Sequence, residues 1–309
     1  MNSKWTHYGF WLMAAGLLPL AGCGGGSTSG EETGLFSLAV SDGPIHDARK
    51  VCITFDEIEF KHSDDAPFVV VLPAPEKVNL LDFQGNNAAP LLFNEELPAG
   101  NYEWLRLGID ASLGSNGGVG DTLGDLCDGE ASYIVMNDDT VHNLFVPSGA
   151  ETGLKLVSGF TVPVNGSADF TAEFDLMKSI TAPPGLQPDV ILKPAIRLVN
   201  NVEAGTLTGQ VADTLATAPD CEPSVYVFDD GVIPNGIEDG VDDPDDPVAT
   251  ALVEELVNGA AVTEYHYTIG FLLAGDYEVA FTCNTEEFEP AEGKPATIAA
   301  QTLTTVDFP

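Results

Sequence analysis

The densest group of side chains that could do chemistry is the aspartate-rich segment at 229–247, DDGVIPNGIEDGVDDPDDP. Ca²⁺ binds about six to eight oxygen ligands, and this segment offers more carboxylates than one ion needs. The acids best suited to such a site are Asp229, Asp230, Asp239, Asp242, Asp243 and Asp245. Their spacing does not match an EF-hand, and a solvated acidic loop between strands is the alternative. Calcium is the one cofactor that the sequence suggests, in a role that orders the loop, and no cofactor is required.

A second group of acids lies in the glycine-rich segment at 112–132. Its members are Asp121, Asp125, Asp128 and Glu130. They would suit another cation site, although the ligands are few and are spread through a long loop. Solvated loop residues are the alternative interpretation.

Histidine and serine show no catalytic spacing. The histidines at 46, 62, 142 and 266 lie far apart and make no HExxH motif, which argues against zinc hydrolysis. There is no GxSxG motif, and Ser148 with His142 would be a catalytic pair only if their geometry allowed it. A carboxylate pair for glycoside hydrolysis cannot be chosen from 48 acids. We therefore assign no catalytic residue.

Aromatic residues in strand-like segments are candidates for a carbohydrate-binding face. They are Tyr102, Trp104, Tyr133, Tyr226, Tyr265 and Tyr267. Aromatic residues in a β-sandwich also pack in the core, which is the alternative. The best exposed candidate is EYHYTI, in which Tyr265 and Tyr267 share one face and His266 lies on the other.

The elements that must position these residues are short strands, which predict an all-β protein. Val51, Ile53 and Phe55 alternate with polar residues, and the alternation resumes out of phase at 58, which predicts a bulge near 56–57. Asn165-Gly166 predicts a hairpin turn. After it, Phe170, Ala172 and Phe174 should face the core, while Asp169, Thr171, Glu173 and Asp175 face water. The best helix candidate, at 250–258, also reads as a strand.

A junction at 199–205 divides the strand-like segments into two sets. Apart from Cys23, which precedes both sets, each set holds two cysteines. The simplest pairing is therefore Cys52 with Cys127 and Cys221 with Cys283. The other two pairings, or reduced thiols, are the alternatives. Each disulfide would stabilise the fold by about 4 kcal/mol in the chain-entropy model.

The N-terminus predicts export. Lys4 is followed by an apolar run that is too short to span a membrane, and Leu20-Ala21-Gly22-Cys23 resembles the lipobox of bacterial lipoproteins. The resemblance implies a signal peptide at 1–22, lipid on Cys23 and, because Gly24 replaces the aspartate of inner-membrane lipoproteins, the outer membrane. An ordinary secretory signal is the alternative. Residues 23–33 then form a flexible tether.

Charge limits the partners. Cleavage removes Lys4 and no acid, so the mature chain keeps 10 of 11 basic residues and all 48 acids, a formal charge of −38. This argues against a nucleic-acid partner. The membrane is reached through the lipid anchor, and the remaining partner is an unidentified protein or carbohydrate.

Two family resemblances cover the mature chain. GTLTGQV at 205–211 and LLAGDYEVAF at 272–281 resemble carboxypeptidase-regulatory-like, transthyretin-like sandwiches, which implies such a domain at 201–309. SLAVSDGPIHDARKVCITFDEIEF, ELPAGNYEWLRLGID, FDLMKSI and LKPAIRLV resemble a bacterial lipoprotein domain of unknown function, which implies a β-sandwich at 34–200. The predicted fold is thus two immunoglobulin-like or transthyretin-like sandwiches behind a cleaved lipoprotein signal.

LPAGNYE and LLAGDYE repeat one device in both domains, and it resembles the tyrosine corner of sandwich folds. Tyr102 and Tyr277 should each bond to the backbone a few residues upstream. The predicted function is a lipid-anchored envelope protein that acts as a non-enzymatic binding or scaffold module. An exported hydrolase of glycan or peptide and a structural surface spacer are the alternatives.

Overall fold

The computed structural model describes residues 32–43, 45–112, 114–147, 153–181, 189–193, 195–237, 243–258 and 261–309. Residues 32–309 form one compact unit. The predicted signal peptide, Cys23 and nearly all of the predicted tether lie outside the described residues. Within the described ranges, no helix is long and apolar enough to cross a membrane.

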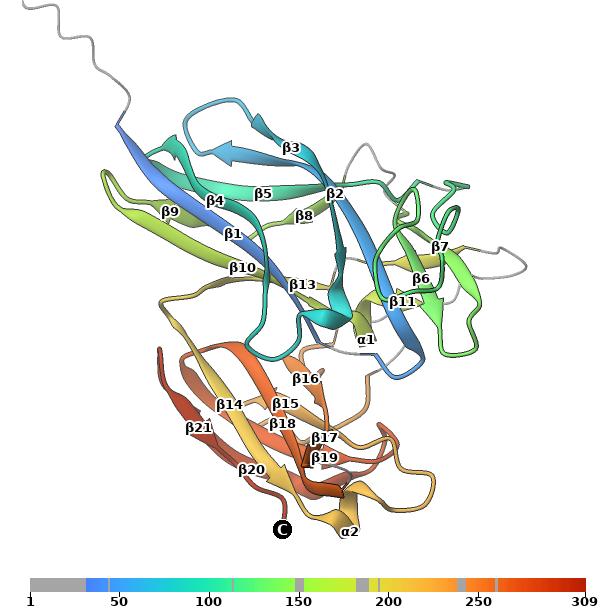
Figure 1. Cartoon of the computed structure of the whole chain (residues 1–309). Helices are drawn as coiled ribbons and strands as arrows, with labels where there is room; N and C mark the ends of the chain where they lie inside the picture. The colour runs from blue at the N-terminus through green and yellow to red at the C-terminus, as the bar shows by residue number, and fades with distance from the viewer. Residues whose placement is uncertain are drawn as a thin grey trace, which may run out of the picture. The chain divides into compact units, whose positions relative to one another are not determined.

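In the described part of 33–200, strands pack as a β-sandwich of two sheets (Figure 1). The first sheet has the order β13-β10-β1-β4, with β1 (Thr33–Gly43), β4 (Ala89–Pro98), β10 (Ser167–Asp175) and β13 (Ile196–Asn200). The second has the order β11-β12-β7-β6-β2-β5-β8, with β3 on β2 and β9 on β5. Its bounds are β2 (Ala48–His62), β3 (Phe68–Asn79), β5 (Gly100–Ile109), β6 (Tyr133–Met136), β7 (Val141–Phe145), β8 (Leu154–Leu156), β9 (Phe160–Val162), β11 (Ile180–Thr181) and β12 (Val190–Leu192).

Aromatic side chains from both sheets fill the core of this sandwich. Phe36 of β1 contacts Phe60 of β2, Phe160 of β9 and Phe170 of β10, with ring centroids 5.3 to 5.8 Å apart. The predicted bulge in β2 is confirmed, because the register of β2 against β3 and β5 shifts between Phe55 and Glu57. The shift keeps Phe55 and Ile58 both buried.

The predicted hairpin at Asn165-Gly166 is wrong. Asn165 does adopt a positive φ of 51°, as the turn requires, but β9 pairs with β5 whereas β10 pairs with β1 and β13. The turn therefore carries the chain from one sheet to the other. A favourable turn sequence fixes the local reversal, but it does not fix which strands become hydrogen-bonded neighbours.

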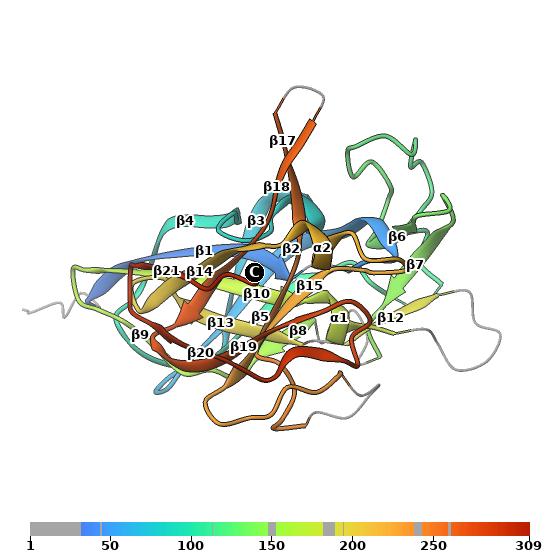
Figure 2. The ribbon, with the colours of Figure 1, turned by 90° about the horizontal axis from the view of Figure 1, so that it is seen from below.

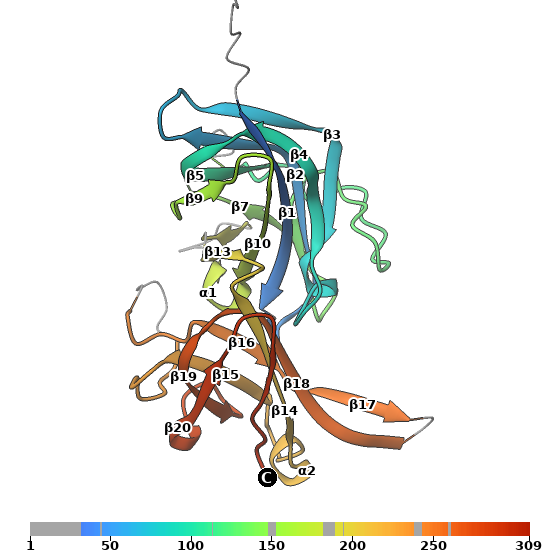
Figure 3. The ribbon, with the colours of Figure 1, turned by 90° about the vertical axis from the view of Figure 1, so that its left-hand side faces the viewer.

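The strands after residue 203 form a second sandwich. One sheet has the order β17-β18-β14-β21, with β14 (Ala204–Val211), β17 (Glu254–Asn258), β18 (Ala261–Leu273) and β21 (Leu303–Thr305). The other has the order β16-β15-β19-β20, with β15 (Ser224–Asp229), β16 (Ala249–Leu252), β19 (Gly275–Thr282) and β20 (Phe288–Ile298). The hairpin of β17 and β18 extends beyond the rest of its sheet (Figure 2 and Figure 3).

Helical structure is confined to short turns in the described residues. These are η1 (Leu80–Asp82), α1 (Leu176–Ser179) and α2 (Asp213–Ala216). The helix considered for 250–258 is wrong, because this segment forms the end of β16 and then β17. Ala249 and Ala251 pack in the core of the second sandwich, which favours the strand.

Both predicted disulfides are present. Cys52 of β2 is joined to Cys127, with the Cα atoms 5.7 Å apart, and Cys221 is joined to Cys283, with the Cα atoms 4.5 Å apart. Each bond lies within one sandwich. Such bonds persist in oxidising compartments, so the protein is extracytoplasmic.

The two tyrosines of the repeated motif make the same contact in the two sandwiches. The Tyr102 hydroxyl donates to the Pro98 carbonyl at 2.8 Å, and the Tyr277 hydroxyl donates to the Leu273 carbonyl at 2.9 Å. Glycine is needed only at the first corner, where Gly100 has a φ of +143° and a β-carbon would lie 2.4 Å from His62 Nε2.

Candidate functional site

The expected water-facing side of β10 is partly covered, so the sequence prediction for Thr171 and Glu173 is wrong. Both side chains are buried. Thr171 Oγ1 donates to Asn201 Oδ1 at 2.9 Å, and Glu173 forms an ion pair with Arg197 of β13. Strict alternation shows which residues share a face, but it does not show whether another element covers that face.

An apolar contact joins the two sandwiches. The Tyr226 hydroxyl of β15 lies 3.2 Å from the Met177 sulfur of α1, and Met177 packs against the cluster that contains Tyr226 and Phe228. The alternate residues Val225 and Val227 pack in the core of the second sandwich. Strand β15 is therefore buried on both faces, and Met177 of α1 packs on the outer one together with Val232 and Ile237.

Polar contacts flank this apolar contact. Lys178 Nζ donates to the Pro247 carbonyl at 2.6 Å and lies 3.5 Å from an Asp246 carboxylate oxygen. Across the same boundary, His46 Nε2 lies 2.8 Å from Ser224 Oγ. We call this boundary the seam. Its contacts explain why residues 32–309 form one compact unit.

A polar cavity of about 350 Å³ opens at the seam. The first sandwich and the segment that follows β3 supply Asp42, Leu81, Asp82, Gln84, Gly85, Asn86, Asn87 and Glu173. The second sandwich supplies Thr250, Ala251, Leu252, Glu254, Thr268, Ile269 and Gly270. The lining thus includes four carboxylates, and none of these lining residues is Lys or Arg. Cavities of this size hold small ligands.

Asp42, near the end of β1, is the most unusual residue of the cavity. It is 3% exposed, and neither carboxylate oxygen has a hydrogen-bond partner among the described residues. Burial raises the pKa of Asp42 well above its ordinary value, and the carboxylates of Asp175 and Glu173 raise it further. The Leu176 amide acts in the opposite direction without reaching hydrogen-bond geometry. The site therefore keeps Asp42 protonated to a higher pH than an exposed aspartate, and a nearby positive charge would oppose this effect.

Two further acids of β10 share this environment. Burial raises the pKa of Glu173 to about 7, although the Arg197 guanidinium lowers it in part. Burial also raises the pKa of Asp175, against the effect of Lys178. Asp175 Oδ1 accepts the Lys178 amide at 3.2 Å, while Oδ2 has no partner among the described residues. These buried carboxylates therefore outnumber the basic side chains beside them.

Thr250 of β16 reaches the cavity from the second sandwich. Its side chain is buried, and Oγ1 has no hydrogen-bond partner among the described residues. A β-carbon built on Gly43 would lie 3.4 Å from this hydroxyl, so Thr250 stands beside the end of β1. Each sandwich thus contributes one buried and unpartnered polar side chain, Asp42 or Thr250, to the same cavity.

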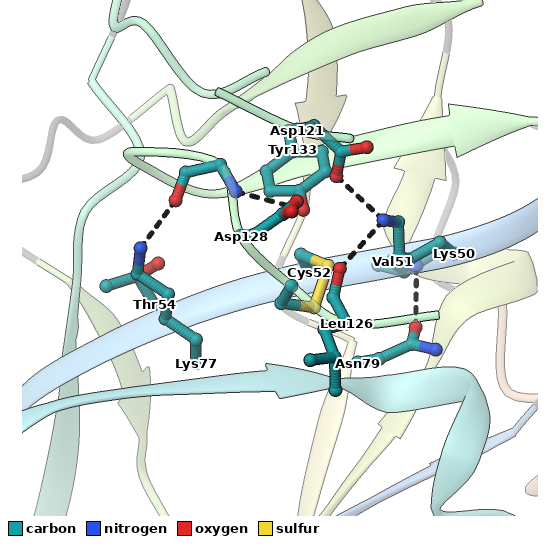
Figure 4. Close-up of a disulfide and its surroundings, with 12 residues drawn as sticks. Lys50, Val51, Cys52, Thr54, Lys77, Asn79, Asp121, Leu126, Asp128 and Tyr133 are labelled. Carbon is teal, nitrogen blue, oxygen red and sulfur yellow. Dashed lines mark hydrogen bonds and ion pairs between the residues drawn. A yellow bond between two sulfur atoms is a disulfide. The ribbon is translucent and has the colours of Figure 1, made fainter. Parts of the chain in front are cut away.

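In the second acidic group, which was considered as a cation site, Asp121 and Asp128 have partners within the protein. Lys50 Nζ donates to Asp121 Oδ2 at 2.7 Å and to the carbonyls of Gly124 and Leu126, next to the Cys52–Cys127 disulfide (Figure 4). Both members of this ion pair are 1% exposed. Burial raises the pKa of Asp121, but hydrogen bonds from Lys50, Tyr133 and the Leu123 amide outweigh it and lower the pKa below its ordinary value.

Asp128 is also engaged, because its two carboxylate oxygens accept the amide and the hydroxyl of Thr122. Asp125 and Glu130 are exposed. Within the described ranges, no three Asp, Glu, His or Cys side chains converge as a metal site. The insert at 112–132 is thus held to β2 by an internal ion pair and a disulfide.

Part of the predicted calcium loop can be placed. Asp239 and Asp242 lie outside the described residues, whereas Asp229, Asp230, Asp243 and Asp245 lie within them. Asp243 Oδ1 accepts the Asp245 amide at 3.1 Å, and Asp229 ends β15. Calcium binding by the complete loop stays a prediction.

The predicted exposed aromatic face is wrong for EYHYTI. Tyr267 is fully buried in the second core, and the partly buried Tyr265 packs against that core as well. Tyr102, Tyr133 and Tyr226 are also buried. Trp104 is partly buried, and Arg106 Cζ and Lys155 Nζ lie 5.1 and 4.3 Å from the centroid of its ring.

The structure joins a histidine and a serine that the sequence did not pair. His46 contacts Ser224, but the Ser224 hydroxyl also donates to the Glu222 carbonyl at 3.1 Å and is fully buried. A buried hydroxyl that is already bonded to a carbonyl is poorly placed to attack a substrate. Ser148 lies outside the described residues, so its pairing with His142 is not tested.

The fold defines an all-β protein of two packed sandwiches. The chain belongs to the family described as "Domain of unknown function (DUF4382)", whose model matches residues 33–194 and so covers nearly all of the first sandwich. Among curated proteins, none matches the sequence.

Solved structures show only distant likeness. A leucine-rich repeat protein of Bacteroides thetaiotaomicron is 14% identical with a TM-score of 0.22, over 90% of this chain and 26% of that one, so the chain spans about a quarter of its length. The minor pilin GBS52 of Streptococcus agalactiae is 12% identical with a TM-score of 0.19, over 88% and 94% of the two chains. The fimbrial anchor protein Mfa2 of Porphyromonas gingivalis is 9% identical with a TM-score of 0.17, over 85% and 82%. Likeness this weak carries no functional argument.

Proposed function

We propose that the protein is a lipid-anchored binding or scaffold module of the cell envelope that uses the seam cavity to hold a ligand and catalyses no reaction. The observation that carries the binding role is the cavity itself, to which both sandwiches contribute and which four carboxylates line. A lining of mixed carboxylates, amides and hydroxyls suits a polar ligand.

The anchor is supported by the sequence Leu20-Ala21-Gly22-Cys23, and export is supported by the two disulfides, which persist in an oxidising compartment. The test is metabolic labelling with palmitate in a bacterial host, followed by membrane fractionation. The full chain should take up label and sediment with the outer membrane. Cys23→Ser should lose both properties, and labelling that survives this substitution would refute the anchor.

The scaffold role is supported by the seam, because its apolar and polar contacts hold the two sandwiches together. A unit of this kind can hold a ligand or a partner at a fixed distance from the membrane. Capture of a stable partner complex with the full chain in its native host, without small-ligand binding, would favour the structural spacer instead.

The calcium proposal concerns the loop at 229–247. Binding of an ion to the native state raises stability by mass action. If calcium orders the loop, millimolar Ca²⁺ should raise the melting temperature and EDTA should lower it. An unchanged melting temperature under both conditions would leave a solvated acidic loop.

A hydrolase of glycan or peptide is the second candidate, and one observation favours it. Asp42 and Glu173 line one cavity, and burial raises the pKa of both, as it does for catalytic acids. The purified mature protein should be screened for turnover of polysaccharides, peptides and esters, with and without Ca²⁺. Turnover that Asp42→Asn or Glu173→Gln abolishes would replace the binding proposal by the enzyme.

A further inference from the structure

We propose that the seam cavity binds a small organic cation with ammonium groups, with Asp42 as the carboxylate that pairs with the charge. The inference rests on the proposed binding role and names the class of ligand. Its basis is the cavity together with two buried, unpartnered side chains that line it from opposite sandwiches, Asp42 and Thr250.

The sign of the ligand's charge follows from the lining. Asp42 and Glu173 are buried, Asp82 and Glu254 are exposed, and none of the lining residues is basic. Of these four acids, Glu173 forms an ion pair with Arg197, and a Glu254 carboxylate oxygen lies 3.8 Å from His266 Nε2. An anionic ligand would meet uncompensated repulsion, whereas a cation would gain from each of these carboxylates.

The arrangement of the acids indicates how the positive charge of the ligand is distributed. A single metal ion needs several oxygen ligands around one point, and no three metal-ligating side chains converge within the described ranges. The cavity of about 350 Å³ is also larger than one ion requires. An extended cation with separate N–H donors matches carboxylates that different segments of the chain supply to the cavity wall. Thr250 Oγ1 and the amide side chains of Gln84 and Asn87 supply further hydrogen-bond acceptors.

Binding should release a proton. The groups that face Asp42 are the acids Glu173 and Asp175 of β10 and the Leu176 amide of α1, while Arg197 and Lys178 act on those two acids. Burial and both acids raise the pKa of Asp42, so in the free protein the acid holds its proton to a higher pH than usual. A ligand cation reverses this preference, and affinity therefore rises with pH.

The experiment is isothermal titration calorimetry of the whole mature protein with 1,5-diaminopentane, and with 1,5-pentanediol as the neutral analogue. An N-acetylated and C-amidated tripeptide that contains lysine, and its norleucine counterpart, distinguish a free amine from a basic side chain as the source of the ammonium group. Titrations at pH 5 in two buffers of different ionisation enthalpy report the proton release. CaCl₂ is titrated as the metal arm.

We expect the diamine or the lysine peptide to bind and the neutral analogues not to bind. Proton release at pH 5 should accompany binding and should decrease in Asp42→Asn, together with roughly a 30-fold or larger loss of affinity. Glu287→Gln removes the same charge from an exposed position outside the cavity and should leave affinity within about twofold.

Asp82→Asn changes an exposed residue of the cavity, so it tests the site without risk to the core. It should weaken binding less than Asp42→Asn does. Equal binding of the diamine to wild type and Asp42→Asn, or binding of Ca²⁺ that Asp42→Asn abolishes, would overturn the inference. Either result would leave the anchored, non-enzymatic role intact, because turnover and palmitate labelling test that role separately.

Discussion

Replacing Glu173 by glutamine should remove a large part of the pH dependence of stability. Glu173 is buried on β10 and lines the seam cavity, and burial raises its pKa from 4.5 to about 7 despite the ion pair with Arg197. A folded-state pKa above the unfolded value means that the folded protein holds the proton more tightly. The stability that this contributes is fully present below pH 4.5 and is lost as the pH rises through about 7.

The magnitude follows from the shift. One pKa unit corresponds to about 1.4 kcal/mol, so a rise from 4.5 to about 7 costs the folded state about 3 kcal/mol once the acid is ionised. About 2.5 kcal/mol of this falls between pH 5 and pH 8. Asp42 and Asp175 shift in the same direction and add to the wild-type slope. His46 opposes them, because burial lowers its pKa and stability is lost as the pH falls below 6.5.

The assay is urea unfolding at pH 5, 6, 7 and 8 at constant ionic strength. At pH 5 folded wild type and Glu173→Gln both carry a neutral, nearly isosteric side chain, so their free energies of unfolding should agree within about 1 kcal/mol. At pH 8 the variant should be more stable by about 2 to 3 kcal/mol. Glu254→Gln, an exposed acid of the same cavity, serves as the control and should follow wild type. Parallel profiles for wild type and Glu173→Gln would refute the reasoning.

Three further predictions concern the contacts that hold the fold. Tyr102→Phe and Tyr277→Phe should each lower the free energy of unfolding by about 1 to 3 kcal/mol, because a backbone carbonyl loses its hydrogen-bond donor. Both variants should leave ligand binding unchanged, and unchanged stability at either corner would contradict the shared role. Lys50→Met should lower the free energy of unfolding by about 3 to 5 kcal/mol, because it leaves the buried Asp121 carboxylate unpaired. Adding Asp121→Leu should recover most of that loss, and a double variant as unstable as the single one would disprove the pairing. Met177→Ala should cost about 2 to 4 kcal/mol and raise protease cleavage at 201–203, and unchanged digestion would show that this contact does not hold the seam.

The residues that sequence reasoning placed well are those whose contacts are local or covalent. The bulge after Phe55 follows from a break in alternation, and the Tyr277 corner joins residues four positions apart. The disulfide Cys52–Cys127 followed from counting two cysteines in each set of strands. Each of these features is decided by a short segment or by a small number of possible pairings.

Sequence reasoning misplaced those residues whose burial depends on which element covers their strand. Thr171 and Glu173 alternate with core residues as an exposed strand would, yet both are buried. Asn201 contacts Thr171, whereas Arg197 pairs with Glu173, which lines the cavity with residues of the second sandwich. Tyr267 lies in a strand with polar neighbours but faces a core. The polar residues at 171 and 173 were therefore correctly grouped on one face and wrongly assigned to water.

The sequence by itself determined the strands, the turns and the paired cysteines, because hydrophobic alternation and turn chemistry act over a few residues. The tertiary structure alone decided that Asn165-Gly166 crosses between sheets and that Asp42, Glu173 and Thr250 line one cavity. These residues come from strands far apart in the chain, and tertiary packing brings them together and buries them. Burial then changes the pKa of a carboxyl that would be ordinary in an exposed loop.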